Sequence, residues 1–276
     1  MSKIYLDNQS TTPVDSEVLK SMIPYFSNNF GNASSKSHSF GWEAEAAIEI
    51  AREKIANLIG CESNEIYFTS GATESNNIIL SNFSGSENQV VTATTEHRAI
   101  LDVCKKLEEC TEVKYLKPEK NGLINNKKIE RQLTNKTSIL SIMHANNEIG
   151  VIHPLNEIGK ICKRKNVLLH VDAAQSLGKI PIDVKKMNVD FMSLSSHKIY
   201  GPKGVGAVYI SNKHIKTIRP LLYGGGQERS IRPGTLPVPL IVGFGQACII
   251  ADEIMGDEAS RIKNLREILI KEIKSK

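Results

Sequence analysis

The chain has 276 residues, of which 40% are hydrophobic and 24% charged, and its formal net charge is +5. This composition is typical of a globular protein and excludes a disordered or fibrous one. The basic residues are dispersed along the chain, which argues against direct nucleic-acid binding. No apolar run reaches the ~20 residues of a membrane-spanning helix, and no signal-peptide pattern is present. We therefore expect a cytoplasmic protein without membrane contact.

The cysteine pattern argues against a disulfide-stabilised protein and against a zinc protein. The cysteines are odd in number, they are widely spaced, and they include no Cys-x-x-Cys pair. This pattern predicts neither a disulfide framework nor a zinc site. We expect reduced thiols and no bound metal at Cys61, Cys104, Cys110, Cys162 and Cys248.

Helix and strand signals alternate along most of the chain. The first long helix is predicted from Phe40 to Ile59, with Ser39 as its N-cap and Gly60 ending it. Another helix begins at Thr73. Short apolar runs typical of buried strands lie at residues 65–69, 89–93, 138–143, 167–171 and 191–195, and helical patterns lie at residues 98–109, 126–134 and 154–165. The alternation predicts an α/β domain with layered helices and a mostly parallel central sheet.

The last stretch, residues 239–276, has a helical pattern. Near its end, apolar side chains recur at helical spacing, at Ile262, Leu265, Leu269 and Ile273. Such an amphipathic face needs a partner surface.

Polar residues suited to catalysis follow three of the predicted strands. In a parallel sheet, ligands bind at the carboxyl ends of the strands. Gly71–Thr73 follows one strand, Asp172 a second, and Ser195–Lys198 a third. The sequence therefore predicts a ligand site at this edge of the sheet.

Lys198 and Asp172 suggest the chemistry of that site. A single lysine is ordinarily a surface residue, but Lys198 lies between small hydroxyl residues and the Gly-Pro turn that begins at Gly201. A buried aspartate at a strand end is unfavourable unless it is paired. A lysine that forms a Schiff base, with an aspartate for a pyridinium nitrogen, is what a pyridoxal 5'-phosphate (PLP) enzyme requires.

Further residues fit the same cofactor. The Gly71 turn at a helix N-terminus is an anion site, although most such turns only connect a strand to a helix. His97 starts a helix after a strand; it could stack on the cofactor ring and move protons, although a histidine there is more often structural. Asn147 follows a strand, and Gln175 could donate a hydrogen bond to the phenolic oxygen of the ring.

These motifs together resemble those of cysteine desulfurases that supply iron–sulfur cluster assembly, the bacterial housekeeping and mitochondrial type. The matching segments are residues 68–76, 95–97, 146–150, 170–172, 195–204 and 232–237. They occur in order along nearly the full length. The resemblance implies class V of the aminotransferases and the three-layer large domain of PLP fold type I.

The resemblance also implies roles for individual residues. Lys198 would hold PLP as a Schiff base, Asp172 would pair with the ring nitrogen, and His97 would stack on the ring and act in acid–base steps. The other residues expected around the ring and the phosphate are Gln175, Asn147, Ala72, Thr73, Ser195, Ser196 and His197. Thr235 would contact the phosphate of the neighbouring subunit, so a homodimer is expected.

The substrate implied by the resemblance is L-cysteine, and the products are L-alanine and an enzyme persulfide. The sulfur would pass to an iron–sulfur scaffold protein and other acceptors, including those that serve tRNA thiolation.

The chain departs from the family pattern in three places. The family usually has glycine at the position of Ser196 and serine at the position of Pro233. Its nucleophilic cysteine lies on a mobile loop of a small C-terminal domain, and none of the five cysteines here has the small-residue context of that loop. We therefore assign no persulfide cysteine. The expected organisation is an N-terminal segment at residues 1–14 that belongs to the small domain, a PLP-binding domain at residues 15–260, and a helix at residues 261–276 leading to an absent small domain.

The leading hypothesis is thus a cysteine desulfurase large domain from a truncated or split gene, and the activity of this chain alone stays open. A non-catalytic paralogue that acts as a binding scaffold is one alternative, but intact Lys198, Asp172 and His97 argue against it. Another PLP enzyme of fold type I, an aminotransferase or a selenocysteine lyase, is the second alternative.

Overall fold

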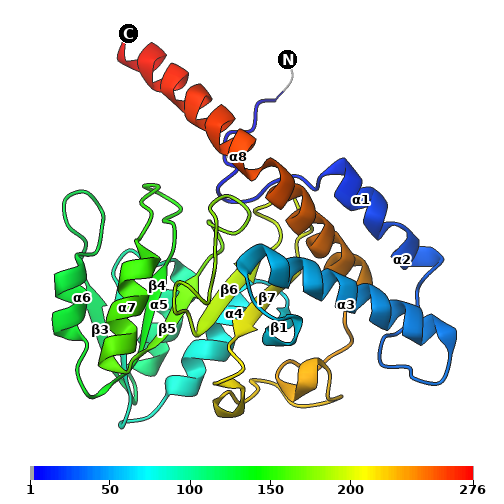
Figure 1. Ribbon diagram of the computed structural model, residues 1–276, viewed down its shortest axis with the longest axis horizontal. Coiled ribbons are helices and arrows are strands. Elements are labelled where there is room, and N and C mark those ends of the chain that lie inside the picture. The colour runs from blue at the N-terminus through cyan, green and yellow to red at the C-terminus, as the bar shows by residue number, and fades with distance from the viewer. Residues whose placement is uncertain (1–2, 276) are drawn as a thin grey trace.

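The computed structural model describes residues 3–275, which contain a seven-stranded sheet with helices on both faces (Figure 1). The strand order is β1-β7-β6-β5-β4-β2-β3. The strands are β1 (Ile66–Thr69), β2 (Gln89–Ala93), β3 (Glu112–Leu116), β4 (Thr137–Met143), β5 (Leu168–Asp172), β6 (Phe191–Ser195) and β7 (Gly206–Ile210). The predicted α/β architecture with a mostly parallel sheet is confirmed.

The direction of the strands determines which strand ends lie along the same edge of the sheet. β7 is antiparallel to both β1 and β6, whereas the pairings among β2, β3, β4, β5 and β6 are parallel. β1 therefore runs in the same direction as β6. The carboxyl ends of all strands except β7 consequently lie along one edge of the sheet.

Eight α-helices are found within the described residues. They are α1 (Ser16–Met22), α2 (Pro24–Ser27), α3 (Ser39–Ile59), α4 (Ala72–Leu80), α5 (Arg98–Leu107), α6 (Asn126–Gln132), α7 (Leu155–Lys165) and α8 (Val238–Lys274). α3 begins one residue before the predicted start. Its N-cap is His38, whose side chain accepts a hydrogen bond from Gly41 N–H, so the prediction of Ser39 as the cap is wrong by one residue. Gly60 ends α3 in the left-handed conformation, as predicted.

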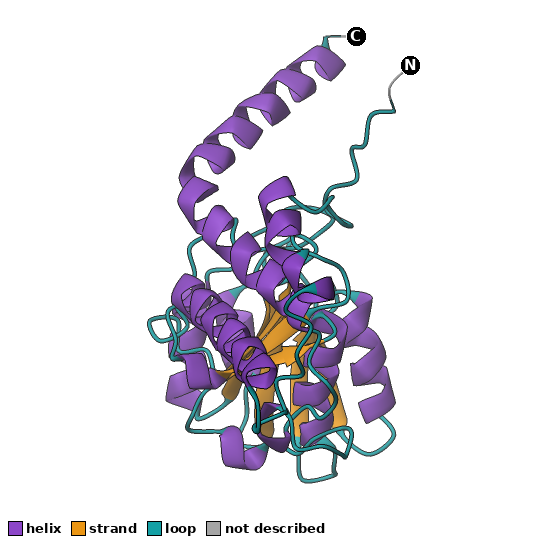
Figure 2. Cartoon of the chain, turned by 90° about the vertical axis from the view of Figure 1, so that its right-hand side faces the viewer, coloured by secondary structure: helices purple, strands orange, loops and turns teal. Residues whose placement is uncertain are grey.

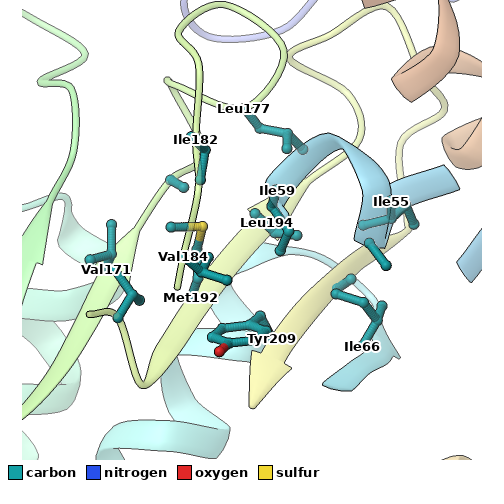
Figure 3. Close-up of a cluster of buried hydrophobic side chains, with 14 of the residues drawn as sticks. Ile55, Ile59, Ile66, Val171, Leu177, Ile182, Val184, Met192, Leu194 and Tyr209 are labelled. Atoms are coloured by element: carbon teal, nitrogen blue, oxygen red, sulfur yellow. The ribbon is translucent and has the colours of Figure 1, made fainter. Parts of the chain in front are cut away.

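The two faces of the sheet bury separate hydrophobic clusters. On β1, Ile66 and Phe68 belong to one cluster and Tyr67 to the other, because successive side chains of a strand point to opposite faces. The first cluster includes residues of α3, α7 and α8, and the second includes residues of α4 and α5. Figure 3 shows part of the first cluster, where Ile55 and Ile59 of α3 lie near Ile66 of β1. The helices therefore hold the sheet, and with it the strand ends, from both sides.

α8 is buried only along its first part. Residues from Val238 to Ala251 include the buried positions, whereas Ile262, Leu265, Leu269 and Ile273 are 49–65% exposed. The second half of the helix extends away from the layered body, on the same side as the N-terminal segment (Figures 1 and 2). By length and composition α8 is the one described helix that could cross a membrane, and 44% of its apolar window is buried inside the protein.

Candidate active site

A cavity of about 450 Å³ lies at the carboxyl edge of the sheet, a size within the range of small-molecule and cofactor sites. The structure brings nine of the eleven predicted site residues together in its walls. These are Ala72, Thr73, His97, Asn147, Asp172, Gln175, Ser195, His197 and Lys198. They come from five separate strand ends.

The turn between β1 and α4 forms one wall of the cavity. Ser70, Gly71, Ala72 and Thr73 line it. The first N–H groups of a helix have no partner within the helix and carry a partial positive charge, so the start of α4 is suited to an anion. Gly206 of β7 lies directly behind the turn, and a Cβ there would stand 2.6 Å from the Gly71 Cα atom. This close packing requires glycine and fixes the position of the turn.

Asp172, the last residue of β5, is 5% exposed. Its Oδ1 accepts a hydrogen bond from Ala174 N–H at 2.9 Å, and its Oδ2 accepts one from Asn76 Nδ2 at 3.1 Å. Within residues 3–275 it forms no ion pair at 4.0 Å or less. A buried carboxylate without a cationic partner is unfavourable. It fits a site in which a bound group supplies the positive charge, such as a protonated pyridine nitrogen.

Lys198 follows β6 and faces the same cavity as Asp172. Burial lowers the pKa of its amine below that of an ordinary lysine, and the charge of Asp172 only partly opposes this effect. A lowered pKa increases the fraction of neutral amine, which is the form that attacks a carbonyl carbon. The pKa of the adjacent His197 is also lowered, by burial and by the charges of Lys198, Lys203 and Lys179. The imidazole of His197 is therefore neutral at pH 7.

His97 is the N-cap of α5. Its Nδ1 accepts a hydrogen bond from Ala99 N–H at 3.1 Å, which leaves Nε2 for contact with a ligand. The preceding residue, Glu96, is buried, and its Oε1 accepts a hydrogen bond from Met143 N–H at 2.9 Å. Burial raises the pKa of Glu96 well above its usual range. Glu96 thus fastens the start of α5 to the end of β4.

The N-terminal segment covers one side of the cavity, and sequence reasoning did not predict this. Ser10 and Thr11 line the cavity. Thr11 Oγ1 lies 3.0 Å from His197 Nδ1, and Thr12 N–H donates to the His197 carbonyl at 3.0 Å. The side chain of Gln175 donates to the Gln9 carbonyl at 2.7 Å. Residues 9–12 are therefore held against the two segments that carry the predicted site.

Two predicted residues do not line this cavity. Ser196 is fully buried, and its Oγ lies against Gly201, where a Cβ would come within 2.1 Å of it. Thr235 is exposed on the loop before α8. Their predicted contacts with a phosphate, in the same subunit for Ser196 and in a neighbouring one for Thr235, stay predictions.

No cysteine within the described residues lines the cavity. Cys104, Cys162 and Cys248 are buried, and burial raises the pKa of Cys104 and of Cys162 to about 12. Cys110 is the exposed thiol, and hydrogen bonds from Ser84 and Thr111 lower its pKa. It lies beyond the far end of α5, about 15 Å of helix from His97.

The groups in the cavity fit PLP. They comprise an anion-binding turn, a buried carboxylate without a counter-ion, and an amine with a lowered pKa. Lys203, which also lines the cavity, adds a positive charge suited to a phosphate. An α/β enzyme domain with such a site is a PLP-binding domain.

The chain belongs to the class-V aminotransferase family, which it matches over residues 4–276. Among its curated relatives are cysteine desulfurases: it is 50% identical to cysteine desulfurase IscS of Ehrlichia chaffeensis, over 98% of this chain and 67% of the relative. It is also 50% identical to cysteine desulfurase IscS of Rickettsia bellii, over 99% of this chain and 68% of the relative. The chain thus spans about two thirds of the length of these relatives. The family is PLP-dependent, and this confirms the predicted cofactor.

Solved structures show the same fold. A NifS-like protein superposes with a TM-score of 0.95 at 41% identity, covering 99% of this chain and 76% of the other. A structure described as SspA in complex with cysteine gives a TM-score of 0.85 at 41% identity, covering 89% of this chain and 72% of the other. The predicted resemblance to cysteine desulfurases and the predicted large domain of PLP fold type I are confirmed.

Proposed function

We propose that this chain is the PLP-binding part of a cysteine desulfurase that acts on L-cysteine. The observation that carries the proposal is the shared cavity of Lys198 and Asp172, with the anion-binding turn of residues 70–73 in its wall. The relatives named cysteine desulfurase and the likeness to a structure containing cysteine support the choice of substrate.

Each residue has a distinct role in the proposed reaction. PLP, when bound, supplies an electrophilic carbonyl carbon and a ring that accepts electrons. Lys198 would hold the cofactor through its Nζ, and its neutral amine would take the proton from the substrate Cα. Asp172 holds a proton on the ring nitrogen, and Nε2 of His97 moves protons at the substrate. Ala72, Thr73, Ser195 and His197 hold the phosphate, while Gln175 and Asn147 orient the ring.

Sulfur transfer to form L-alanine needs a thiolate that reaches the substrate sulfur. Within residues 3–275, no cysteine lies in the cavity walls. We propose that the nucleophile comes from a C-terminal small domain, as in the family, with residues 1–14 belonging to that domain and residues 261–276 beginning the helix that leads to it. The acceptors would be an iron–sulfur scaffold protein and other sulfur carriers, including those for tRNA thiolation, in the cytoplasm.

This proposal is tested by separating the proton step from the sulfur step. The PLP-loaded chain in D₂O should exchange the α-proton of L-cysteine, whereas its sulfide and alanine production should not exceed that of free PLP. NMR measures the exchange, and colorimetric sulfide and alanine assays measure turnover. Adding a polypeptide with the family's C-terminal domain should restore sulfur transfer. Sulfide release by the chain alone that is lost on mutation of one of its own cysteines would contradict the proposal.

A further inference from the structure

An ion pair lies directly behind the anion-binding turn. Arg232 Nε donates to Glu74 Oε1 at 2.9 Å, and Arg232 Nη2 approaches Glu74 Oε2 at 3.4 Å. The side chains of Arg232 and Glu74 are only 21% and 16% exposed. Water therefore screens this pair less than it screens an ordinary surface pair.

Glu74 is part of the turn itself. It lies in the first turn of α4, and its Oε2 accepts a hydrogen bond from Ser70 N–H. Ser70 through Thr73 line the cavity, so Glu74 fixes the backbone that would receive a phosphate. It also brings a negative charge close to that position, and like charges repel.

The loop that carries Arg232 is held rigidly. Glu228, Arg229 and Ser230 are three consecutive residues with left-handed backbones, at φ 47°, 54° and 67°. Glu228 is buried, and its carboxylate accepts hydrogen bonds from the Arg52 guanidinium at 2.7 and 2.8 Å and from Phe68 N–H at 2.6 Å. These bonds fasten the loop to β1, the strand that precedes the anion-binding turn.

We propose that Arg232 is a positioning residue that neutralises Glu74, so that the turn fixed by Glu74 can bind a phosphate dianion. The inference rests on the proposed binding of the PLP phosphate at residues 70–73. Burial alone would raise the pKa of Glu74, but the hydrogen bonds from Arg232 and Ser70 hold it below its usual value. Glu74 is therefore ionised, and its charge needs a counter-ion when a phosphate is bound.

The test compares PLP with pyridoxal, which lacks the phosphate. Dissociation constants are measured by absorbance titration of the apoprotein for the wild type, Arg232→Met, Glu74→Gln and the double variant. Arg232→Met should weaken PLP binding about tenfold, because it leaves a bare carboxylate beside the dianion. Its affinity for pyridoxal should change less than about twofold. Glu74→Gln removes the negative charge and leaves the positive charge of Arg232, so it should tighten PLP binding, and adding Glu74→Gln to Arg232→Met should restore the affinity lost in Arg232→Met.

The double variant separates this role from a purely structural one. If the ion pair merely held the loop in place, Glu74→Gln would weaken PLP binding as much as Arg232→Met, and the double variant would not recover. Equal losses for PLP and pyridoxal in Arg232→Met would also overturn the inference. Arg229→Met is the matched control from the same loop, since its guanidinium stacks 4.1 Å from the Tyr67 ring centroid and donates to the Ile66 carbonyl. It should affect both ligands alike.

The affinities of the wild type for PLP and pyridoxal test the proposed phosphate site separately from the role of Arg232. A clear preference for PLP over pyridoxal supports the phosphate site, whatever the outcome for Arg232. A wild type that binds both ligands equally would overturn the phosphate site and the inference with it.

Discussion

Asp172 and Lys198 show how single residues set the chemistry of the cavity. Asp172 is ionisable, buried and without an ion-pair partner in the described chain, whereas Lys198 is held with a lowered pKa by burial. Each would be unfavourable in an empty protein interior. Both become useful when a ligand brings a cationic ring nitrogen and an aldehyde.

The lowered pKa of Lys198 predicts the pH dependence of PLP capture. Only the neutral amine reacts, so the rate should rise with pH and level off at a lower pH than for a free lysine amine. The charge of Asp172 raises the pKa of Lys198, so Asp172→Asn should move the midpoint to still lower pH. Stopped-flow absorbance of the apoprotein mixed with PLP, with N-acetyl-lysine amide as reference, measures both midpoints. A wild-type midpoint at or above that of the reference would contradict this assignment.

The site residues that were predicted from the sequence are marked by a local pattern, whereas those that were missed are not. The nine predicted residues in the cavity follow their own strand or lie in a recognisable motif. Thr11 and Thr12 instead reach His197 from 185 or more positions away, and no local pattern encodes such a contact. Asn76 was not predicted as a site residue for another reason. It lies inside α4, where its place in the helix was predictable but its hydrogen bond to Asp172 was not.

At the scale of secondary structure, apolar runs predicted five of the seven described strands and missed β3 and β7. Five predicted strands occur within one residue of their expected bounds. β3 was missed because it is an edge strand with the mixed sequence Glu112–Leu116 and only one buried residue. β7 was also missed, although its five residues are all buried. Its apolar run follows the glycine-rich turn that begins at Gly201, and such a turn is typical of a loop, so no strand was predicted there.

The loop before α8 depends on one buried ion pair. Arg52 on α3 contacts Glu228 with side chains 7% and 1% exposed. Removing one partner of such a pair leaves an uncompensated buried charge, so Arg52→Met should lower the free energy of unfolding by about 3–5 kcal/mol. Urea denaturation followed by circular dichroism measures it.

A surface pair provides the control for that measurement. Arg164 contacts Glu130 with side chains 59% and 43% exposed, so Arg164→Met should cost no more than about 1 kcal/mol. Similar losses for both variants would show that the Arg52–Glu228 pair does not anchor the loop.

At the scale of the whole molecule, exposed aromatic residues agree with the homodimer that the family resemblance leads us to expect. Phe26, Phe30, Phe40 and Trp42 are each more than half exposed, and Phe30 and Phe40 lie with ring centroids 5.7 Å apart. Exposed aromatic side chains of this kind are typical of surfaces that bind another protein. Thr235 is also exposed, as the predicted contact with a neighbouring subunit requires.

Mixed dimers test whether Thr235 acts across that interface. Thr235→Val alone should weaken PLP binding by about tenfold to 150-fold, which is the loss of roughly one hydrogen bond to a charged group. Lys198→Ala should form no Schiff base. A heterodimer of the two variants, prepared by refolding a mixture with two different tags, should contain one site of wild-type affinity. Failure to recover that site would place Thr235 in its own subunit's site, and an unchanged PLP affinity in Thr235→Val alone would place it outside any site.

The central claim is that this chain holds PLP on Lys198 in the cavity at the carboxyl edge of its sheet. The most direct test is borohydride reduction of the PLP-loaded chain, followed by mass-spectrometric mapping of the modified lysine. Lys179 is the natural competitor, since desolvation of its ammonium group and the charge of Lys198 lower its pKa to about 8. We expect a single pyridoxyl label on Lys198, with the yellow colour and the label both lost in Lys198→Ala and retained in Lys179→Ala. A label on Lys179, or a folded wild type that stays colourless and unlabelled with excess PLP, would contradict the account.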